Sequence, residues 1–295
     1  MTVALQIFIN GILIGALWAI LGLGKQLILG VLRFVNFAHA SFALIAMYII
    51  YYMWKSTGVN PFVLVLPVVV ILGLIGLALE RPLIRPLVNK GQRSQMIATL
   101  ALLTLIQSLL SLLFGATSHT VTSGLTSTGT ALLPGVFVTW SSLLIFVIAL
   151  VAFALVWLLL NRTTFGLKIR ATSQRRDSAI YCAINVRSTY GLAFALSIAL
   201  AGLVGALYAI GTPVNPTSAA PLLVLMFVVP ILGGLGSIPG ALVGGFIVGI
   251  LQGLTTQILP PQLENAVIYL VFVLFLMARP QGLLGDSALL TERTT

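Results

Sequence analysis

The sequence predicts an all-α integral membrane protein, a polytopic helical bundle of about eight or nine crossings with broken or re-entrant helices. The first observation is composition: only 7% of the 295 residues are charged and 59% are hydrophobic. A soluble domain carries roughly 25% charged residues. The second is run length, because the apolar stretches reach about 17 to 22 residues, enough to cross a ~30 Å hydrocarbon core. A single transmembrane domain over residues 1–295 is therefore expected.

The expected helices follow the apolar stretches in order: Val3–Leu23, His39–Trp54, Pro61–Leu79, Gln95–Phe114, Val138–Leu160, Thr189–Gly211, Leu222–Leu232, Ala241–Leu259 and Asn265–Ala278. The seventh is too short to cross alone, and so is the apolar segment Leu27–Phe37. Short segments of this kind fit half-helices or re-entrant elements that face protein or a water-filled cavity. The first stretch has no basic region before it and no clear cleavage site, so we expect a retained span rather than a signal peptide.

Lysine and arginine set the predicted orientation. They gather in two loops, Glu80–Ser94 and Asn161–Ser188, while the intervening segment Gly115–Phe137 has none. Because cytoplasmic loops are enriched in these residues, both basic loops are placed inside and the intervening segment outside. The same alternation places the tail, residues 279–295, in the cytoplasm, and the N-terminus outside if Leu27–Phe37 does not cross. The net charge of +10 is explained this way rather than by nucleic-acid binding.

Polar residues near the start of the chain form the first candidate site. Arg33, Asn36 and His39 interrupt apolar sequence, and an arginine at the bilayer centre costs on the order of 3 kcal/mol or more. These side chains should therefore lie at an interface or in a polar interior. Two interpretations remain open, an interfacial helix end and a broken helix beside a translocation path.

A glycine-rich segment forms the second candidate site, with Gly233, Gly234, Gly236 and Ser237 between two apolar stretches. Glycine and proline that interrupt a hydrophobic segment are typical of a discontinuous helix. Plain glycine-mediated helix packing is the alternative, and the two are compatible. A phosphate-binding P-loop is excluded, because no lysine follows these glycines.

The second basic loop holds the third candidate. Residues Gln174–Ile184 read as an amphipathic helix capped by Thr172 or Ser173. One face would be small and apolar (Ala179, Cys182, Ala183), and the other charged (Arg175, Arg176, Asp177). The segment is either a solvated loop or a helix that docks in a groove of a cytoplasmic partner.

Catalytic chemistry finds little support in the sequence. His39 and His119 are far apart, the five acidic residues fall mainly in loops or at span ends, and Cys182 is the single cysteine. No hydrolase or metalloprotease motif is present. We expect no catalytic residue, metal or cofactor in this chain.

Six short motifs occur together in one order: Gly30–His39, Gly166–Ala171, Ala183–Asn185, Ala201–Tyr208, Gly233–Ala241 and Arg279–Leu283. In this order the sequence resembles the permeases of bacterial ABC importers for branched-chain (hydrophobic) amino acids, of the LivH type. The resemblance covers nearly the whole chain. It departs from the family at Ala40 and Ala183, where the family usually has glycine, and at Leu225–Pro230, where charged or small residues are common.

The resemblance implies a multi-pass protein of the bacterial cell inner membrane that works with several partners. These are a second related permease or a second copy, two cytoplasmic ATP-binding subunits and an extracytoplasmic solute-binding protein. The segment that would contact the ATPase includes Arg170, Arg175, Arg176, Asp177 and Asn185. The path for the solute would involve Arg33, Asn36, His39, Gly233, Gly234, Gly236 and Ser237.

The identity of the solute stays open at this point, because related permeases carry urea, short amides and other amino acids. A secondary transporter and a passive channel are the alternatives of a different class. A secondary transporter usually places acidic residues inside the membrane for ion coupling, and this chain has almost none there.

Overall fold

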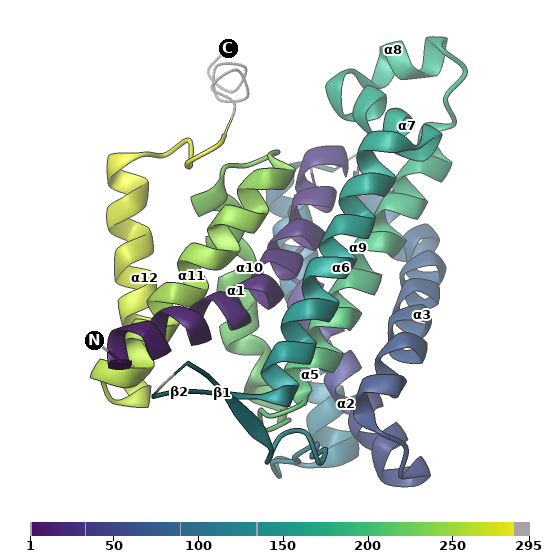
Figure 1. Cartoon of the computed structure of the whole chain (residues 1–295). Coiled ribbons are helices and arrows are strands. Elements are labelled where there is room, and N and C mark those ends of the chain that lie inside the picture. Colours follow the sequence, from purple (N-terminus) through teal and green to yellow (C-terminus); the bar gives the residue numbers. More distant parts are fainter. Residues whose placement is uncertain (1, 33, 89, 134, 286–295) are drawn as a thin grey trace. The chain divides into compact units, whose positions relative to one another are not determined.

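The computed structural model describes residues 2–32, 34–88, 90–133 and 135–285. The elements are almost all helical (Figure 1): α1 Thr2–Leu27, η1 Ile28–Leu32, α2 His39–Thr57, α3 Pro61–Leu79, η2 Glu80–Ile84, α4 Arg85–Val88, α5 Gln92–Phe114, β1 Gly129–Leu133, β2 Val136–Thr139, α6 Trp140–Arg162, α7 Thr164–Gln174, α8 Arg176–Tyr181, α9 Val186–Ala209, η3 Pro216–Ser218, α10 Ala219–Gly233, α11 Ile238–Ile258 and α12 Pro261–Ala278. The elements η1 and η2 are π-helical turns and η3 is a 3-10 turn.

Seven helices among the described residues are long and apolar enough to cross a membrane. The polytopic all-α fold class is therefore confirmed. The prediction of about eight or nine crossings also counted α12, whose apolar part Leu263–Ala278 is shorter, and α2, which is not among the seven. Most side chains of α2 are buried against protein, so this helix needs less apolar surface than one that faces lipid.

The chain forms two compact units, each built from separate stretches of sequence. Unit 1 contains residues 1–26, 122–152 and 224–295, and unit 2 contains residues 27–121 and 153–223. This division into compact units does not test whether residues 1–295 form a single transmembrane domain, which stays a prediction. Each unit is described by itself below.

Unit 2 is organised around α9, which packs against both α2 and α3. Small residues allow these backbones to approach closely. A Cβ added to Gly205 would lie 2.0 Å from the Ala43 carbonyl oxygen, and one added to Gly202 would lie 2.7 Å from Leu72 Cβ. The glycines of the family motif Ala201–Tyr208 thus serve helix packing.

Unit 1 pairs α1 with α11 in antiparallel directions. Contacts run in opposite order along the two helices: Ile7 meets Gly253, Gly15 meets Gly249 and Ala19 meets Gly245. At the start of α1, the Gln6 side chain bonds to the backbone of Phe137 in β2, donating at 2.8 Å and accepting at 2.7 Å. The N-terminal turns of α1 therefore lie at the β1–β2 hairpin. The two therefore lie at one end of unit 1, and the side of the membrane that they face stays a prediction.

The hairpin itself is absent from the sequence prediction, which treated residues 115–137 as loop and began the fifth span at Val138. Strands β1 and β2 pair antiparallel, Val136 and Val138 pack with Leu13 of α1, and α6 begins only at Trp140. Alternating valines on β2 supply a buried face, which explains why a strand forms here.

The prediction of a separate short segment over Leu27–Phe37 is wrong. Residues up to Leu32 continue the first helix, which spans Val3–Leu32 without a break. Lys25, which follows the predicted end of the first span at Leu23, is buried, with its Nζ 4.1 Å from the ring centroid of Phe227. The aromatic face compensates part of the cost of burying the cation, so the helix continues past it.

Candidate functional site

The chain leaves helical structure inside unit 2 between η1 and α2. Residues 34–36 are irregular, a turn follows, and α2 begins at His39. Phe34, Asn36 and Ala38 are all at most 1% exposed. Arg33, the remaining predicted residue of this site, lies outside the described residues. The chain is therefore non-helical and buried here, and its position beside a translocation path stays a prediction.

Two side chains of α5 satisfy the backbone of this segment. Gln95 Oε1 accepts a hydrogen bond from the Val35 N–H at 3.4 Å, and Thr99 Oγ1 accepts one from the Phe37 N–H at 3.1 Å. The Thr99 hydroxyl also lies 3.4 Å from the Val35 carbonyl oxygen. Non-helical backbone at membrane depth is tolerated only where such partners exist. Sequence reasoning missed Gln95 and Thr99, and their polarity within an apolar span was the available signal.

The start of α2 lies beside the middle of α9. His39 is fully buried, and its Nδ1 is 3.5 Å from Ser197 Oγ, and Ser197 falls halfway along Val186–Ala209. The Asn36 Oδ1 accepts from the Ala38 N–H at 3.0 Å and so holds the turn that precedes the helix. The N-terminal end of α2, which carries partial positive charge, therefore lies inside unit 2 rather than at its surface. No signal in the sequence indicated that Ser197 contacts His39, because a serine within an apolar span is common.

The glycine-rich segment lies in unit 1 and forms the turn between α10 and α11. Gly234 and Gly236 have φ values of +106° and +85°, a region that favours glycine. Ser237 caps α11, its Oγ accepting from the Gly240 N–H at 3.1 Å. A Cβ added to Gly233 would lie only 1.9 Å from the Gly240 carbonyl oxygen. The chain thus reverses direction here, and two helices pack closely, rather than one helix being interrupted.

A glutamine from α1 holds this turn in place. Gln26 Nε2 donates to the Gly234 carbonyl oxygen at 2.8 Å, and Gln26 Oε1 accepts from the Gly236 N–H at 2.6 Å. The segment after α12 adds two backbone bonds, from Leu283 to Leu232 and from Leu284 to Gly233, both 2.9 Å. The turn therefore lies with the predicted cytoplasmic tail, at the end of α1 away from the hairpin. Gln26 was not among the predicted residues.

The predicted docking segment consists of two helices rather than one. Helix α7 continues to Gln174, the chain extends at Arg175 with φ −145° and ψ 110°, and α8 follows. The predicted caps are wrong, because the Thr172 hydroxyl bonds to the Lys168 carbonyl within α7 and Ser173 bonds to Arg170 O. Each hydroxyl finds a partner in the preceding turn, so neither ends a helix.

The predicted apolar face of this segment also differs. Ala179 is buried at 2% exposed, but Ile180 and Tyr181 are 53% and 90% exposed, and Cys182 is exposed. Ala183 has φ +55°, a conformation that favours glycine. A glycine at this position, as the resemblance implies for related permeases, would adopt this conformation without strain.

The predicted charged residues of this region occupy different surroundings. Arg170 Nη1 donates to the Leu160 carbonyl oxygen and lies 3.4 Å from Asn161 Oδ1, so it ties α7 to the end of α6. Asn185 caps α9 by accepting from the Ser188 N–H at 3.1 Å. Arg175 and Asp177 are exposed, while the side chain of Arg176 is outside the description.

This architecture defines a class, the polytopic α-helical transport permeases, with an unwound segment inside the helical unit and a short helical pair among the basic residues. Residues 7–276 match the family described as "Branched-chain amino acid transport system / permease component". The chain therefore belongs to this family. It is a permease component of such a transport system and a multi-pass inner-membrane protein.

Individual relatives agree over almost the full length. The chain is 25% identical to the high-affinity branched-chain amino acid transport system permease protein BraD of Pseudomonas aeruginosa, over 95% of each chain. It is equally 25% identical to the LivH permease of Escherichia coli K12, again over 95% of each. A probable LivH permease of Methanocaldococcus jannaschii is 28% identical over 94% of this chain and 91% of its own. No solved structure matches the chain.

Proposed function

We propose that this chain is the membrane-spanning subunit of an ATP-driven importer that carries branched-chain or other hydrophobic amino acids into the cytoplasm. The observation that carries the proposal is the family match over residues 7–276, together with relatives of that printed function. The chain has no nucleotide-binding motif of its own, so partner subunits supply the ATP hydrolysis. A second permease, two ATP-binding subunits and an external solute-binding protein complete the system.

The solute path runs beside the unwound segment of unit 2. An amino-acid carboxylate is stabilised by the N-terminal end of a helix, and in broken-helix transporters such ends point at the substrate near the midplane. The start of α2 at His39 lies beside the middle of α9, which supports a path at this depth. Asn36 and His39 then lie on the path with Arg33. The turn of Gly233, Gly234, Gly236 and Ser237 forms a second element of the path in unit 1.

Helices α7 and α8 form the contact for an ATP-binding subunit. The exposed Ile180 and Tyr181 stand on a helix whose inner face is anchored by buried Ala179. Exposed apolar side chains on a short helix, surrounded by charge at Arg175 and Asp177, fit a helix-in-groove contact. Arg170 in the middle of α7 bonds to the end of α6 and Asn185 caps α9, so both connect this contact to membrane-spanning helices.

Uptake measurements test the transport function. Right-side-out vesicles or proteoliposomes that contain the complete system are loaded with and without ATP, and given the solute-binding protein with leucine, isoleucine, valine, urea or a short amide on the outside. ATP-dependent uptake of the branched-chain amino acids is expected. Uptake without ATP, or uptake restricted to urea or amides, would contradict the proposal.

Cysteine accessibility tests the path. In a Cys182→Ser background, Asn36→Cys and Ser237→Cys should react with a water-soluble maleimide at rates that change when transport is running. Ala46→Cys is the matched control, because Ala46 is fully buried within α2 and should stay unreactive. An Asn36→Cys variant that is inaccessible throughout turnover would remove the unwound segment from the path.

Charge reversal tests the docking contact. Arg175→Glu with Arg176→Glu, and separately Tyr181→Ala, should weaken association of the ATP-binding subunit and its solute-stimulated hydrolysis while membrane insertion is unchanged. Arg93→Glu, on the other basic loop, is the control and should have little effect. Normal association in both test variants would exclude α8 as the contact.

A further inference from the structure

An exposed apolar stripe runs along α3 and ends at an arginine. Its members recur every three or four residues, so they share one face of the helix, and their exposed fractions are Val63 64%, Leu66 71%, Val70 53%, Leu74 60% and Leu77 43%. The next position on this face is Arg81, at the first turn of η2. The stripe thus changes from apolar to basic at the cytoplasmic end of the helix, within unit 2.

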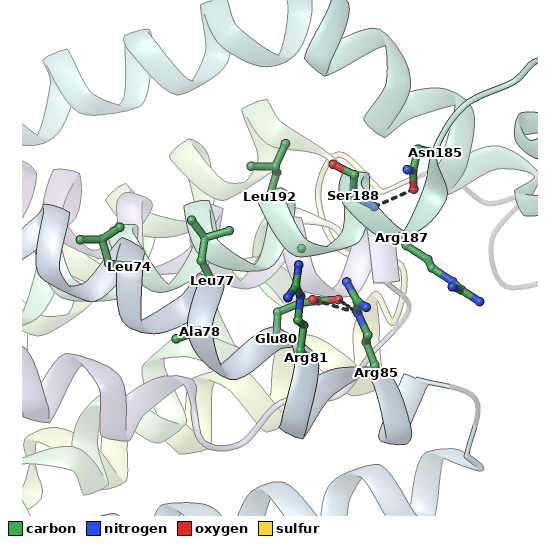
Figure 2. Close-up of a pocket in the computed structure, with 11 residues that line it drawn as sticks. Leu74, Leu77, Ala78, Glu80, Arg81, Arg85, Asn185, Arg187, Ser188 and Leu192 are labelled. Atoms are coloured by element: carbon green, nitrogen blue, oxygen red, sulfur yellow. Dashed lines mark hydrogen bonds and ion pairs between the residues drawn. The ribbon is translucent and has the colours of Figure 1, made fainter.

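A pocket of about 730 Å³ lies where the stripe meets the start of α9. Figure 2 shows leucines at one side and arginines at the other: Leu74, Leu77 and Leu192 lie toward the middle of the helices, while Arg81, Arg85 and Arg187 lie toward their ends. The pocket brings together residues of the two basic loops, since Arg85 and Arg187 both line it although they are 102 positions apart in the sequence. It therefore combines an apolar wall with a basic end.

The charge of this pocket is only partly compensated. The Glu80 side chain is 6% exposed and accepts from Arg85 Nε with both carboxylate oxygens, each at 3.0 Å. Neither Arg81 nor Arg187 forms a hydrogen bond or ion pair with a described residue. The first turn of α9, capped by Asn185, adds the partial positive charge of a helix N-terminus. The pocket is built to receive an anion.

We propose that this pocket binds the phosphate headgroup of an anionic phospholipid from the cytoplasmic leaflet, with an acyl chain along the α3 stripe. Arg81 and Arg187 contact the phosphate, and Leu74 and Leu77 contact the chain. Basic pockets between helices on the cytoplasmic side fit such headgroups. A soluble partner matches the arginines but not the apolar stripe that continues along α3. The inference rests on the membrane orientation and is independent of the transported solute.

Lipid retention by the purified protein tests this assignment. The full chain with its partner subunits is delipidated in detergent and titrated with phosphatidylglycerol or phosphatidylethanolamine, and bound lipid is counted by native mass spectrometry. The double variant Arg81→Gln with Arg187→Gln should lose about 25-fold in phosphatidylglycerol affinity, because each basic residue near the surface contributes roughly fivefold. Arg81→Lys with Arg187→Lys should retain most of it, and this variant also controls for folding.

The matched control removes the same charge elsewhere. Arg93→Gln with Arg162→Gln lies on the same two basic loops outside the pocket and should change phosphatidylglycerol binding less than about threefold. Equal losses in test and control variants would overturn the pocket assignment in favour of general surface charge. Competition by glycerol phosphate at equal concentration would identify a site for soluble phosphate. Unchanged lipid binding with loss of the ATP-binding subunit would make the pocket a protein contact instead.

Discussion

Replacing Thr99 with valine is expected to loosen the buried non-helical segment, because this hydroxyl links the segment to α5. The Oγ1 accepts from the Phe37 N–H at 3.1 Å and lies 3.4 Å from the Val35 carbonyl oxygen. Valine has nearly the same volume as threonine, so the change removes hydrogen bonding without opening a cavity. The perturbation therefore reports on the polar contact alone.

The magnitude follows from burial. Thr99 is 1% exposed, and the loss of the partner of one buried polar group costs ~1–3 kcal/mol. The longer contact to Val35 adds little, so the expected loss of stability is about 1–3 kcal/mol in total. Thr104→Val is the matched control on the same helix, because the Thr104 hydroxyl bonds only to carbonyls of its own helix, at Leu100 and Ala101. Its expected effect is within ~0.5 kcal/mol.

The assay is unfolding in detergent micelles together with solute uptake in vesicles. Thr99→Val should unfold more easily than Thr104→Val and should transport more slowly, while Thr99→Ser, which keeps the hydroxyl, should resemble the natural protein. Equal stabilities for the two valine variants would refute the reasoning. So would a serine variant as unstable as the valine variant.

Three further substitutions test other contacts. Gly249→Ala should cost ~1–3 kcal/mol by overpacking, because its Cβ would lie 2.3 Å from a backbone oxygen of α1, whereas Gly91→Ala meets open space and should be neutral in thermal unfolding. Gln26→Leu should speed amide hydrogen exchange in the α10–α11 turn, since it removes the three hydrogen bonds from Gln26 to Gly234, Gly236 and Ser237. Exchange as slow as in the natural protein would contradict this role of Gln26. Arg85→Gln should lower the free energy of unfolding by more than the ~0–1 kcal/mol typical of an exposed ion pair and by less than the ~3–5 kcal/mol typical of a buried one. The intermediate value is expected because Glu80 is buried while Arg85 is partly exposed. A double variant that also carries Glu80→Gln should recover most of that lost stability. If the effects of the two single substitutions simply add in this double-mutant cycle, Arg85 and Glu80 are not energetically coupled.

The sequence predicted the parts of the fold that depend on local pattern. Long apolar runs, read with the known length of a crossing helix, located nearly every helix. The clustering of basic residues in two loops predicted that these loops share one end, and the structure brings Arg81 and Arg187 of those loops to one pocket. Polar residues between η1 and α2 predicted a break near Asn36. Each of these signals lies within a few turns of one helix.

Local pattern failed where a side chain has a distant partner. The first span was predicted to end at Leu23, but the helix continues past Lys25, whose ammonium group lies over the ring of Phe227. Thr172 and Ser173 looked like helix caps, but their hydroxyls bond within α7. The β1–β2 hairpin was missed because its buried face exists only through packing on Leu13 of α1. In each case tertiary contacts overrode a correct reading of local preference.

The sequence by itself determined that this chain lies in a membrane and which family it resembles, and it predicted an orientation, because hydrophobic run length, motif order and charge placement are one-dimensional properties. Only the tertiary structure decided how polar residues inside the apolar runs are satisfied. Gln95 and Thr99 act on a segment about 60 residues away, Ser197 on one 158 residues away and Gln26 on one 210 residues away. A hydrogen bond in a membrane interior needs a specific partner at ~3 Å, and such distances are set by how the helices pack.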